Sequence, residues 1–361
     1  RKEIYKQIDS MSGIAAKFAI ANEYDKMMSL LGAKGTNAFT SNEVTAYVND
    51  IPSNQIEKWL TVESERFRNP IFRIFHTELE AVYEEKNRGL DNDNRKANEA
   101  LMAALFQKHN YGQQTTIGTI EHLKNPSLKE IRKYFYNNYV PNNMCMILVG
   151  DFNPDAVMKM VDEKFSAFQP KEVKPYIAEP EAEITAPIER TVYGPKDEWI
   201  DIGFRLPGAN TKDAGLLQFM DRIFANGTAG LFDINIVKKQ KALNAYTYPD
   251  ILKDYSVFVL HGNPKQGQSL EEVRKLLLDE VENLKKGNLD DELIQAVKNN
   301  FIKEQLQKTE RNNDRAFNIL DGFITNVPWN DALSFYDEIN SITKEQIVAF
   351  ANKWLKNNYV V

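Results

Sequence analysis

The sequence predicts an α+β fold of two duplicated domains, each a mostly antiparallel β-sheet with helices packed on one face. Helical and strand-like hydrophobic periods follow one another in the same order in both halves, and short motifs recur at a nearly constant offset. The length of 361 residues fits about two domains of ordinary size. A stretch without periodicity, 169–187, is expected to link them. The two copies are therefore assigned to 1–180 and 181–361.

The first half opens with helical periodicity and continues into strands. Apolar residues at helical spacing predict a helix over 1–31 with a break at 12–13. Alternating apolar and polar residues predict strands over 36–50. Ser53 is expected to cap the next helix, because its hydroxyl can accept an orphan backbone N–H, and Pro70 ends that helix.

Two further helices and an apolar strand complete this half. The helix from about Ile71 into the 90s carries many carboxylates, and Ser127 and Glu130 have the spacing of a capping box for a later helix. The apolar run 144–149 predicts a buried strand. Cys145, the only cysteine, lies inside it and is expected to be buried. A single cysteine excludes an intramolecular disulfide.

The second half repeats landmarks of the first. The motif Asn-Ala-aromatic-Thr at 37–40 recurs 207 residues later, at 244–247. Glu78-Leu79 recurs 214 residues later, and the capping box at Ser127 recurs 216 residues later, at Thr343. Three matches in the same order at nearly constant spacing indicate an ancient duplication.

The charge balance argues against a nucleic-acid binder. The chain has 45 Lys and Arg against 51 Asp and Glu, a net charge of −6, which gives no electrostatic attraction to nucleic acid or anionic lipid. No apolar run approaches the roughly 20 residues of a membrane-spanning helix, so no membrane span is expected. The sequence opens at Arg1 without an initiator Met, as a segment of a longer protein would. Any targeting segment is expected before residue 1, and the compartment stays open, with the bacterial periplasm or cell envelope among the candidates.

The acidic helix after Pro70 is the first candidate for chemistry. Glu78 and Glu85 lie two helical turns apart, so they share a face about 10 Å apart along the axis. One of them could bind a metal ion while the other orients a further ligand, or both could belong to a solvated face. In the second copy Glu292 matches Glu78, whereas Lys298 or Asn299 falls opposite Glu85. This difference is typical of a duplication in which one half keeps a site and the other only the fold.

Other catalytic patterns are weak or missing from the sequence. His76 and Glu80 are four residues apart and could share a metal, but nothing nearby supplies a third ligand. The sequence contains no glycine-rich phosphate loop, no G-x-S-x-G elbow and no H-E-x-x-H helix. A second candidate site is an extended segment with a small residue between polar ones. It is suited to pair as a sheet edge with another peptide, although most strand edges are only edges; it consists of Asn37, Ala38, Phe39 and Thr40.

Taken in order, these motifs resemble the insulinase/pitrilysin family of zinc metallopeptidases, which also includes the mitochondrial processing peptidases and core subunits of respiratory complexes. The match extends over the whole chain. The residues that carry it are Asn37–Ser41, Thr45–Tyr47, Glu78 and Glu85, His109–Gly112, Tyr139–Asn143 and Val149–Asp151.

The resemblance implies roles for the candidate residues. Members of the family have an inverted motif, H-x-x-E-H, whose histidines bind Zn²⁺ and whose glutamate activates the attacking water, while a distant glutamate completes the site. Glu85 resembles that third zinc ligand and Glu78 the carboxylate that supports it. The edge strand 37–40 resembles the strand that hydrogen-bonds an extended peptide substrate. Active members close two such halves like a clamshell, so this chain resembles one half.

The chain departs from the family because it contains no H-x-x-E-H. Either the motif, with the general-base glutamate, lies before Arg1, or catalysis has been lost. The first alternative implies part of a zinc metalloendopeptidase that is inactive as the isolated chain, which would then carry no zinc by itself. The second implies an inactive structural subunit of a heteromeric peptidase complex. The expected partners are a peptide substrate and a second homologous half, in the same parent chain or in a separate subunit.

Overall fold

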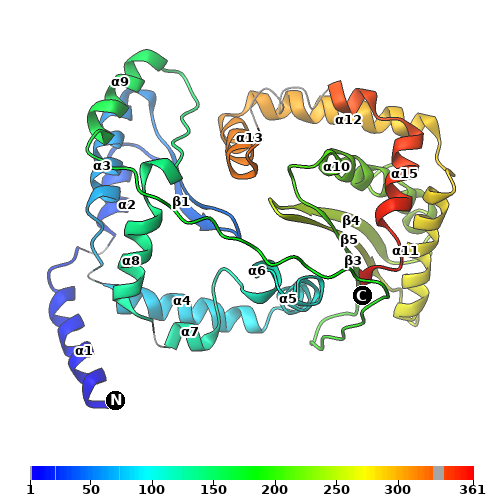
Figure 1. The fold of residues 1–361 in the computed structure, drawn as a ribbon, viewed down its shortest axis with the longest axis horizontal. Helices are drawn as coiled ribbons and strands as arrows, with labels where there is room; N and C mark the ends of the chain where they lie inside the picture. Colours follow the sequence, from blue (N-terminus) through cyan, green and yellow to red (C-terminus); the bar gives the residue numbers. More distant parts are fainter. Residues whose placement is uncertain (1, 21, 73, 125, 328–336) are drawn as a thin grey trace. The chain divides into compact units, whose positions relative to one another are not determined.

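The structure, a computed structural model, describes residues 2–20, 22–72, 74–124, 126–327 and 337–361 (Figure 1). It divides into two compact units. The first is Arg1–Leu90 with Gln114–Ile177, and the second is Asp91–Gln113 with Ala178–Val361. The chain thus passes between the units three times. The last passage lies next to the expected boundary at 180, whereas the segment Asp91–Gln113 packs with the second unit rather than the first.

The first unit combines one hairpin with several helices. Strands β1 and β2 pair antiparallel, with Ala38 opposite Tyr47. Helices α3 and α9 pack together around Leu60 and Val157. The elements of this unit are α1 (Lys2–Ala16), α2 (Glu23–Leu30), β1 (Lys34–Thr40), β2 (Thr45–Asp50), the 3₁₀ turn η1 (Ser53–Gln55), α3 (Ile56–Arg68), α4 (Phe75–Leu90), α7 (Ile120–Lys124), α8 (Leu128–Asn138), the 3₁₀ turn η2 (Pro141–Asn143) and α9 (Pro154–Phe165).

Two predicted boundaries in this unit are wrong. Helix α1 runs through Gly13 to Ala16, so the break lies after 16 and not at 12–13. A glycine inside a helix costs only about 1 kcal/mol, which the rest of the helix can offset. Ser53 lies inside the 3₁₀ turn and caps nothing, because α3 begins only at Ile56. The predicted end of α3 before Pro70 is confirmed, since the helix ends at Arg68.

The predicted strand 144–149 is also wrong. These residues form no strand, and Cys145, expected to be buried, is exposed. A strand exists through its ladder partner, and within the described residues only β1 and β2 pair in this unit. The apolar pattern therefore identified an extended segment but not its pairing. Half of the capping box predicted before α8 is confirmed, because the Ser127 hydroxyl accepts the backbone N–H of Glu130.

The second unit is built on a four-stranded antiparallel sheet in the order β4-β5-β3-β6. The capping box predicted at Thr343 and Gln346 is confirmed in both directions. The elements are α5 (Asp93–Leu105), α6 (Asn110–Gln113), β3 (Ile200–Pro207), α10 (Lys212–Phe224), the π-helical turn η3 (Asp233–Val237), β4 (Asn244–Ile251), β5 (Tyr255–Asn263), α11 (Leu270–Lys285), α12 (Asp291–Glu310), α13 (Asn312–Thr325), α15 (Lys344–Trp354) and β6 (Tyr359–Val360).

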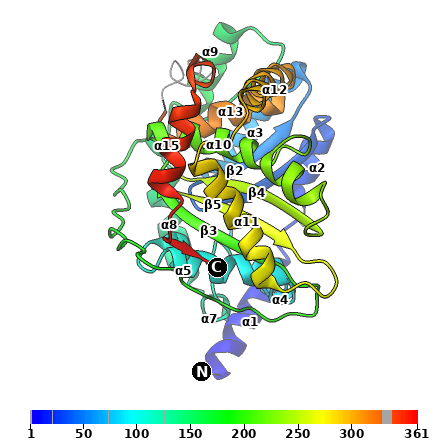
Figure 2. The same ribbon diagram turned by 90° about the vertical axis from the view of Figure 1, so that its right-hand side faces the viewer.

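Alternation along the strands of this sheet creates two buried faces. Helices α10 and α11 cover one face, with α15 packed against both of them (Figure 2). Phe204 of β3 and Phe258 of β5 are fully buried on this side. On the other face α5 approaches β3 so closely that a Cβ at Gly203 would lie 2.9 Å from a Leu101 methyl group. The sheet therefore carries helices on one side as expected, and α5 as an addition on the other.

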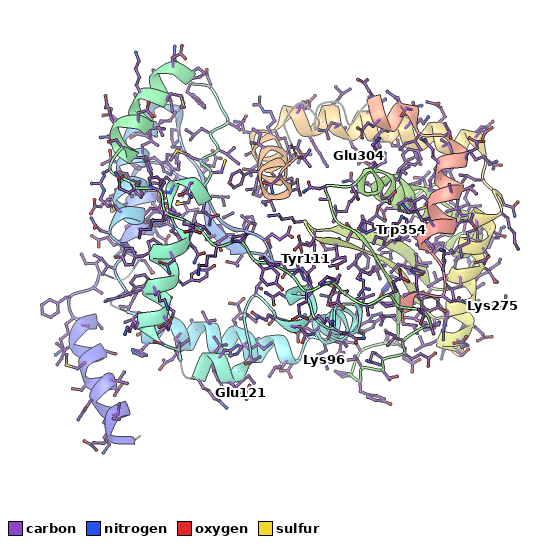
Figure 3. The ribbon with its side chains drawn as sticks, viewed as in Figure 1. Lys96, Tyr111, Glu121, Lys275, Glu304 and Trp354 are labelled. Carbon is purple, nitrogen blue, oxygen red and sulfur yellow. The ribbon has the colours of Figure 1, made fainter. Side chains whose placement is uncertain are left out.

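Polar contacts join the helices around this core. Glu304 of α12, which is labelled in Figure 3, accepts a hydrogen bond from Arg222 of α10 at 3.1 Å. The indole N–H of Trp354, in α15, donates to Asp213 at the start of α10, also at 3.1 Å. The predicted linker 169–187 contains no helix or strand.

Candidate active site

Helix α4 presents the two carboxylates that the sequence singled out. Glu78 lies in its first turn and Glu85 two turns later, and both side chains are exposed. Seven residues of helix separate them by about 10 Å along the axis, on one face. Neither carboxylate forms a hydrogen bond or ion pair with another residue in the described ranges.

The donor set in the described chain does not fit a complete metal site. A catalytic zinc site needs three protein ligands and an open position. Within the described ranges no three His, Cys, Asp or Glu side chains are grouped closely enough to hold an ion. Glu85 offers a carboxylate oxygen, which is one suitable ligand of the three. The spacing of His76 and Glu80 likewise gains no third ligand in the folded chain, as far as the structure describes it.

Strand β1 forms the edge of its sheet. The four residues of the second candidate site are all exposed, including Phe39 at 37%. Strand β1 pairs with β2 on one side, and within the described residues no strand lies against its other side. A one-sided strand offers its outer backbone row to an added extended peptide. The structure thus places the predicted edge segment in an edge strand.

An irregularity in the ladder precedes that segment. The register between β1 and β2 shifts between Lys34 and Asn37. Gly35 lies in this shift with φ of 58°, a left-handed conformation that costs glycine little. Because side chains alternate with a period of two, a shift by one residue moves every following side chain to the opposite face. The bulge therefore decides which faces Asn37–Thr40 present.

A polar and aromatic cluster in the same unit was not predicted from the sequence. The guanidinium of Arg66 lies over the rings of Tyr24 and Tyr47, at 4.2 Å and 4.4 Å from their centroids. A neighbouring cavity has a volume of about 320 Å³ and is lined by Tyr47, Arg66, Phe67, Asn69–Phe72 and Phe135. These residues come from separate elements, so no spacing in the sequence could have connected them.

Comparison with known protein families identifies the family of this α+β chain. Residues 11–119 match the family model described as insulinase, peptidase family M16, and residues 126–301 match the one described as peptidase M16 inactive domain. The chain belongs to the insulinase family, M16. This confirms the family and the α+β fold expected from the motifs.

Similar proteins extend over most of the chain. The zinc protease PqqE of Helicobacter pylori is 25% identical over 349 residues, which cover 93% of this chain and 77% of that protein. The crystal structure of a protease from Helicobacter pylori has a TM-score of 0.87 at 22% identity and covers 94% of this chain and 84% of that one. The periplasmic protease PqqL from Escherichia coli has a TM-score of 0.76 at 15% identity, over 94% of this chain but 41% of that one.

The insulinase family includes zinc proteases, which are metal-dependent hydrolases. In the described ranges, none of the helices combines the length and apolarity that crossing a bilayer requires.

Proposed function

We propose that this chain is one half of a zinc-dependent metalloendopeptidase that hydrolyses extended peptides in an enclosed chamber. The observation that carries the proposal is the exposed, one-sided strand β1 in the same unit as the exposed carboxylate of Glu85. A peptidase of this kind needs a surface that holds the substrate backbone and a ligand for its metal. The family match supports both roles.

In this proposal Glu85 binds the zinc ion and Glu78 orients another ligand from the same helix face. A separation of about 10 Å along the axis is too long for both carboxylates to contact one ion. It suits one ligand and one supporting group that receives a hydrogen bond from a metal-bound imidazole. The remaining ligands and the general base would come from residues before Arg1 in a parent chain.

Strand β1 is the proposed substrate strand. An extended peptide that pairs with its outer edge would gain backbone hydrogen bonds whatever its sequence, while side-chain pockets would supply the preference. The residues that would pair with it are Asn37, Ala38, Phe39 and Thr40.

The proposed partner is a second homologous half. The likeness to PqqL covers two-fifths of that chain, 41%, so a protein of this fold can carry a further half in one polypeptide. PqqL from Escherichia coli is described as a periplasmic protease, which supports the periplasm as a candidate location for a bacterial parent of this chain.

The decisive test is Glu85→Gln in the intact parent protein. The amide keeps the size of the side chain but is a poor zinc ligand, so we expect loss of stoichiometric zinc and a fall of at least about 100-fold in cleavage of a quenched peptide. The matched control is Glu84→Gln, which changes an exposed neighbour on the same helix. Full zinc content and activity in Glu85→Gln would refute the ligand assignment.

A second candidate function is that of an inactive structural subunit in a heteromeric peptidase complex. This alternative rests on the sequence itself, which contains no H-x-x-E-H motif. The family model over residues 126–301, described as peptidase M16 inactive domain, agrees with a non-catalytic second half in either function. The same measurement separates the two, because an inactive subunit would show neither zinc nor cleavage in the wild-type parent.

A further inference from the structure

We propose that Arg66 is a positioning residue that, through a relay of polar side chains, holds the bulge of β1 and with it the register of the proposed substrate strand. This inference rests on the proposed function for the identity of the strand, but the relay itself lies wholly within the first unit. Its members come from four elements: Thr36 in β1, Tyr47 and Asn49 in β2, Tyr24 in α2, and Glu63 and Arg66 in α3.

The relay begins at the bulge. The hydroxyl of Thr36, which lies between the shifted positions of the ladder, donates to the side-chain oxygen of Asn49 at 3.1 Å. The amide group of Asn49 donates in turn to the Tyr24 hydroxyl, also at 3.1 Å. The bulge of β1 is thus connected by side chains to helix α2, across β2.

The relay ends on a buried carboxylate. The Tyr24 hydroxyl donates to Glu63 at 2.5 Å, and the side chain of Glu63 is only 4% exposed. Burial, with a contribution from Glu63, raises the pKa of Tyr24 to about 12, so its hydroxyl remains a donor throughout the neutral range. A buried carboxylate without a cationic partner would be costly. The partner is Arg66, whose Nη1 lies 3.3 Å from both carboxylate oxygens.

The guanidinium of Arg66 makes a second set of contacts. It lies over the Tyr24 ring of α2 and over the Tyr47 ring of β2, so one side chain contacts both elements through cation–π interactions. Tyr47 lies directly opposite Ala38, in the middle of the substrate segment. The contact of Arg66 with Tyr47 therefore restrains the β1–β2 register at Ala38. The hydrogen bond of Thr36 restrains the bulge, where that register begins.

These contacts decide the faces of the strand. A slip by one residue would turn the side chains at 37–40 to the opposite side of the hairpin. A two-stranded hairpin is marginally stable alone, so such a slip must be prevented from outside the ladder. The relay and the guanidinium of Arg66 provide that restraint.

The test uses this chain with Arg66→Lys, which keeps the charge beside Glu63 but loses the planar group that lies over both rings. We expect amide hydrogen exchange to accelerate at least tenfold at residues 36–40 and 46–49, with little change elsewhere. Binding of a fluorescein-labelled ten-residue peptide of alternating Thr and Val should weaken at least fivefold. The matched control is Arg68→Lys, whose side chain bonds the Lys164 carbonyl instead, and it should change neither.

Tyr24→Phe provides a second variant if Arg66→Lys folds poorly. It removes only the hydroxyl that joins Asn49 to Glu63 and keeps the ring beneath Arg66, so it should raise exchange at the same amides. Unchanged exchange in both variants, or an equal rise throughout the first unit, would overturn the positioning role. A wild-type chain that shows no peptide binding while the variants still loosen residues 36–40 would refute the proposed substrate strand and leave the positioning role intact.

Discussion

Asp221 of α10 shows how burial changes the chemistry of a single carboxyl group. Its Oδ1 accepts a hydrogen bond from the Thr247 hydroxyl at 2.7 Å. Burial is the largest influence and raises the pKa of Asp221 to about 6, although Thr247 and Arg222 oppose the rise. In an unfolded chain the same group titrates near 3.9. The folded state therefore holds this proton more tightly than the unfolded state does.

The raised pKa of Asp221 makes the stability of the folded chain depend on pH. Stability contributed by Asp221 is present below its unfolded pKa and is lost as the pH rises through about 6. Two pKa units correspond to about 3 kcal/mol, and partial exposure brings the expected loss closer to about 2 kcal/mol. Asp221→Asn should remove this loss and raise the thermal midpoint at pH 7.5 but not at pH 4. A melting series over pH 4–8 checks it.

The control for that series is Asp279→Asn on α11, where the carboxylate pairs with Lys275 and is 51% exposed. This variant should keep the pH dependence of the wild type. If Asp221→Asn also kept it, burial of Asp221 would not be the source of the effect.

Residues in one element were accessible from the sequence, whereas clusters drawn from several were not. Glu78 and Glu85 share a helix, so their spacing alone predicted a common face, and both are exposed on α4. Arg66, Glu63 and Tyr24 come together only when α3 packs beside α2 and the hairpin. No local pattern encodes such a meeting, because it depends on contacts between residues far apart in the sequence, such as Tyr24 and Glu63, which are 39 positions apart.

At the scale of elements, the same residue type has opposite consequences in two places. Gly13 lies in α1 with nothing within 4 Å of a built Cβ. At Gly262 of β5, a Cβ would lie 2.5 Å from Val273 and 3.2 Å from Leu277, both on α11. One glycine only weakens a helix, while the other permits a helix to approach a strand.

Alanine at each position should therefore act in opposite directions. Gly13→Ala should stabilise α1 by about 0.5–1 kcal/mol, because alanine restricts the unfolded backbone and meets no neighbour. Gly262→Ala should destabilise the second unit by about 1–3 kcal/mol through overpacking. Circular dichroism of helix content and denaturant unfolding measure the two effects. Equal stability of Gly262→Ala and the wild type would contradict the close packing of α11 on β5.

At the scale of the whole molecule, a polar cluster around the side chain of Glu181 connects separate segments of the second unit. The side chain of Glu181, 3% exposed, accepts the backbone N–H groups of Lys108 and His109, both at 2.7 Å. It also pairs with Arg205 of β3, which donates to the Leu105 carbonyl. The Glu181 cluster thus connects the start of the segment Ala178–Val361 to the loop between α5 and α6 and to the central sheet.

Removing the charge of Glu181 should destabilise the second unit by weakening the Glu181 cluster. Burial alone would raise its pKa, but the hydrogen bonds from His109 and Lys108 outweigh burial and lower it. A lowered pKa means stability that is present above the unfolded value of 4.5 and lost as the pH falls. Glu181→Gln should cost about 3 kcal/mol at pH 7, since it removes the carboxylate that neutralises the charge of Arg205. The difference in the free energy of unfolding between this variant and the wild type should become smaller below pH 4.5.

Glu179→Gln is the matched control, because Glu179 lies two residues away, is 77% exposed and makes only a long contact of 3.9 Å with Lys108. It should change stability by less than about 0.5 kcal/mol. Urea unfolding at pH 7 and pH 4 compares the two variants. An equally small effect of Glu181→Gln would show that the Glu181 cluster does not stabilise the second unit.

Local and repeating information was sufficient for the family, for most helices and strands, and for the face that Glu78 and Glu85 share. These follow from periodicity, capping and short motifs, which act over a few residues. Pairing and burial could not be predicted in the same way: the apolar run around Cys145 remains outside any sheet, and the segment 91–113 packs with the second unit. Both depend on which distant surface is available, and long-range contacts alone decide that.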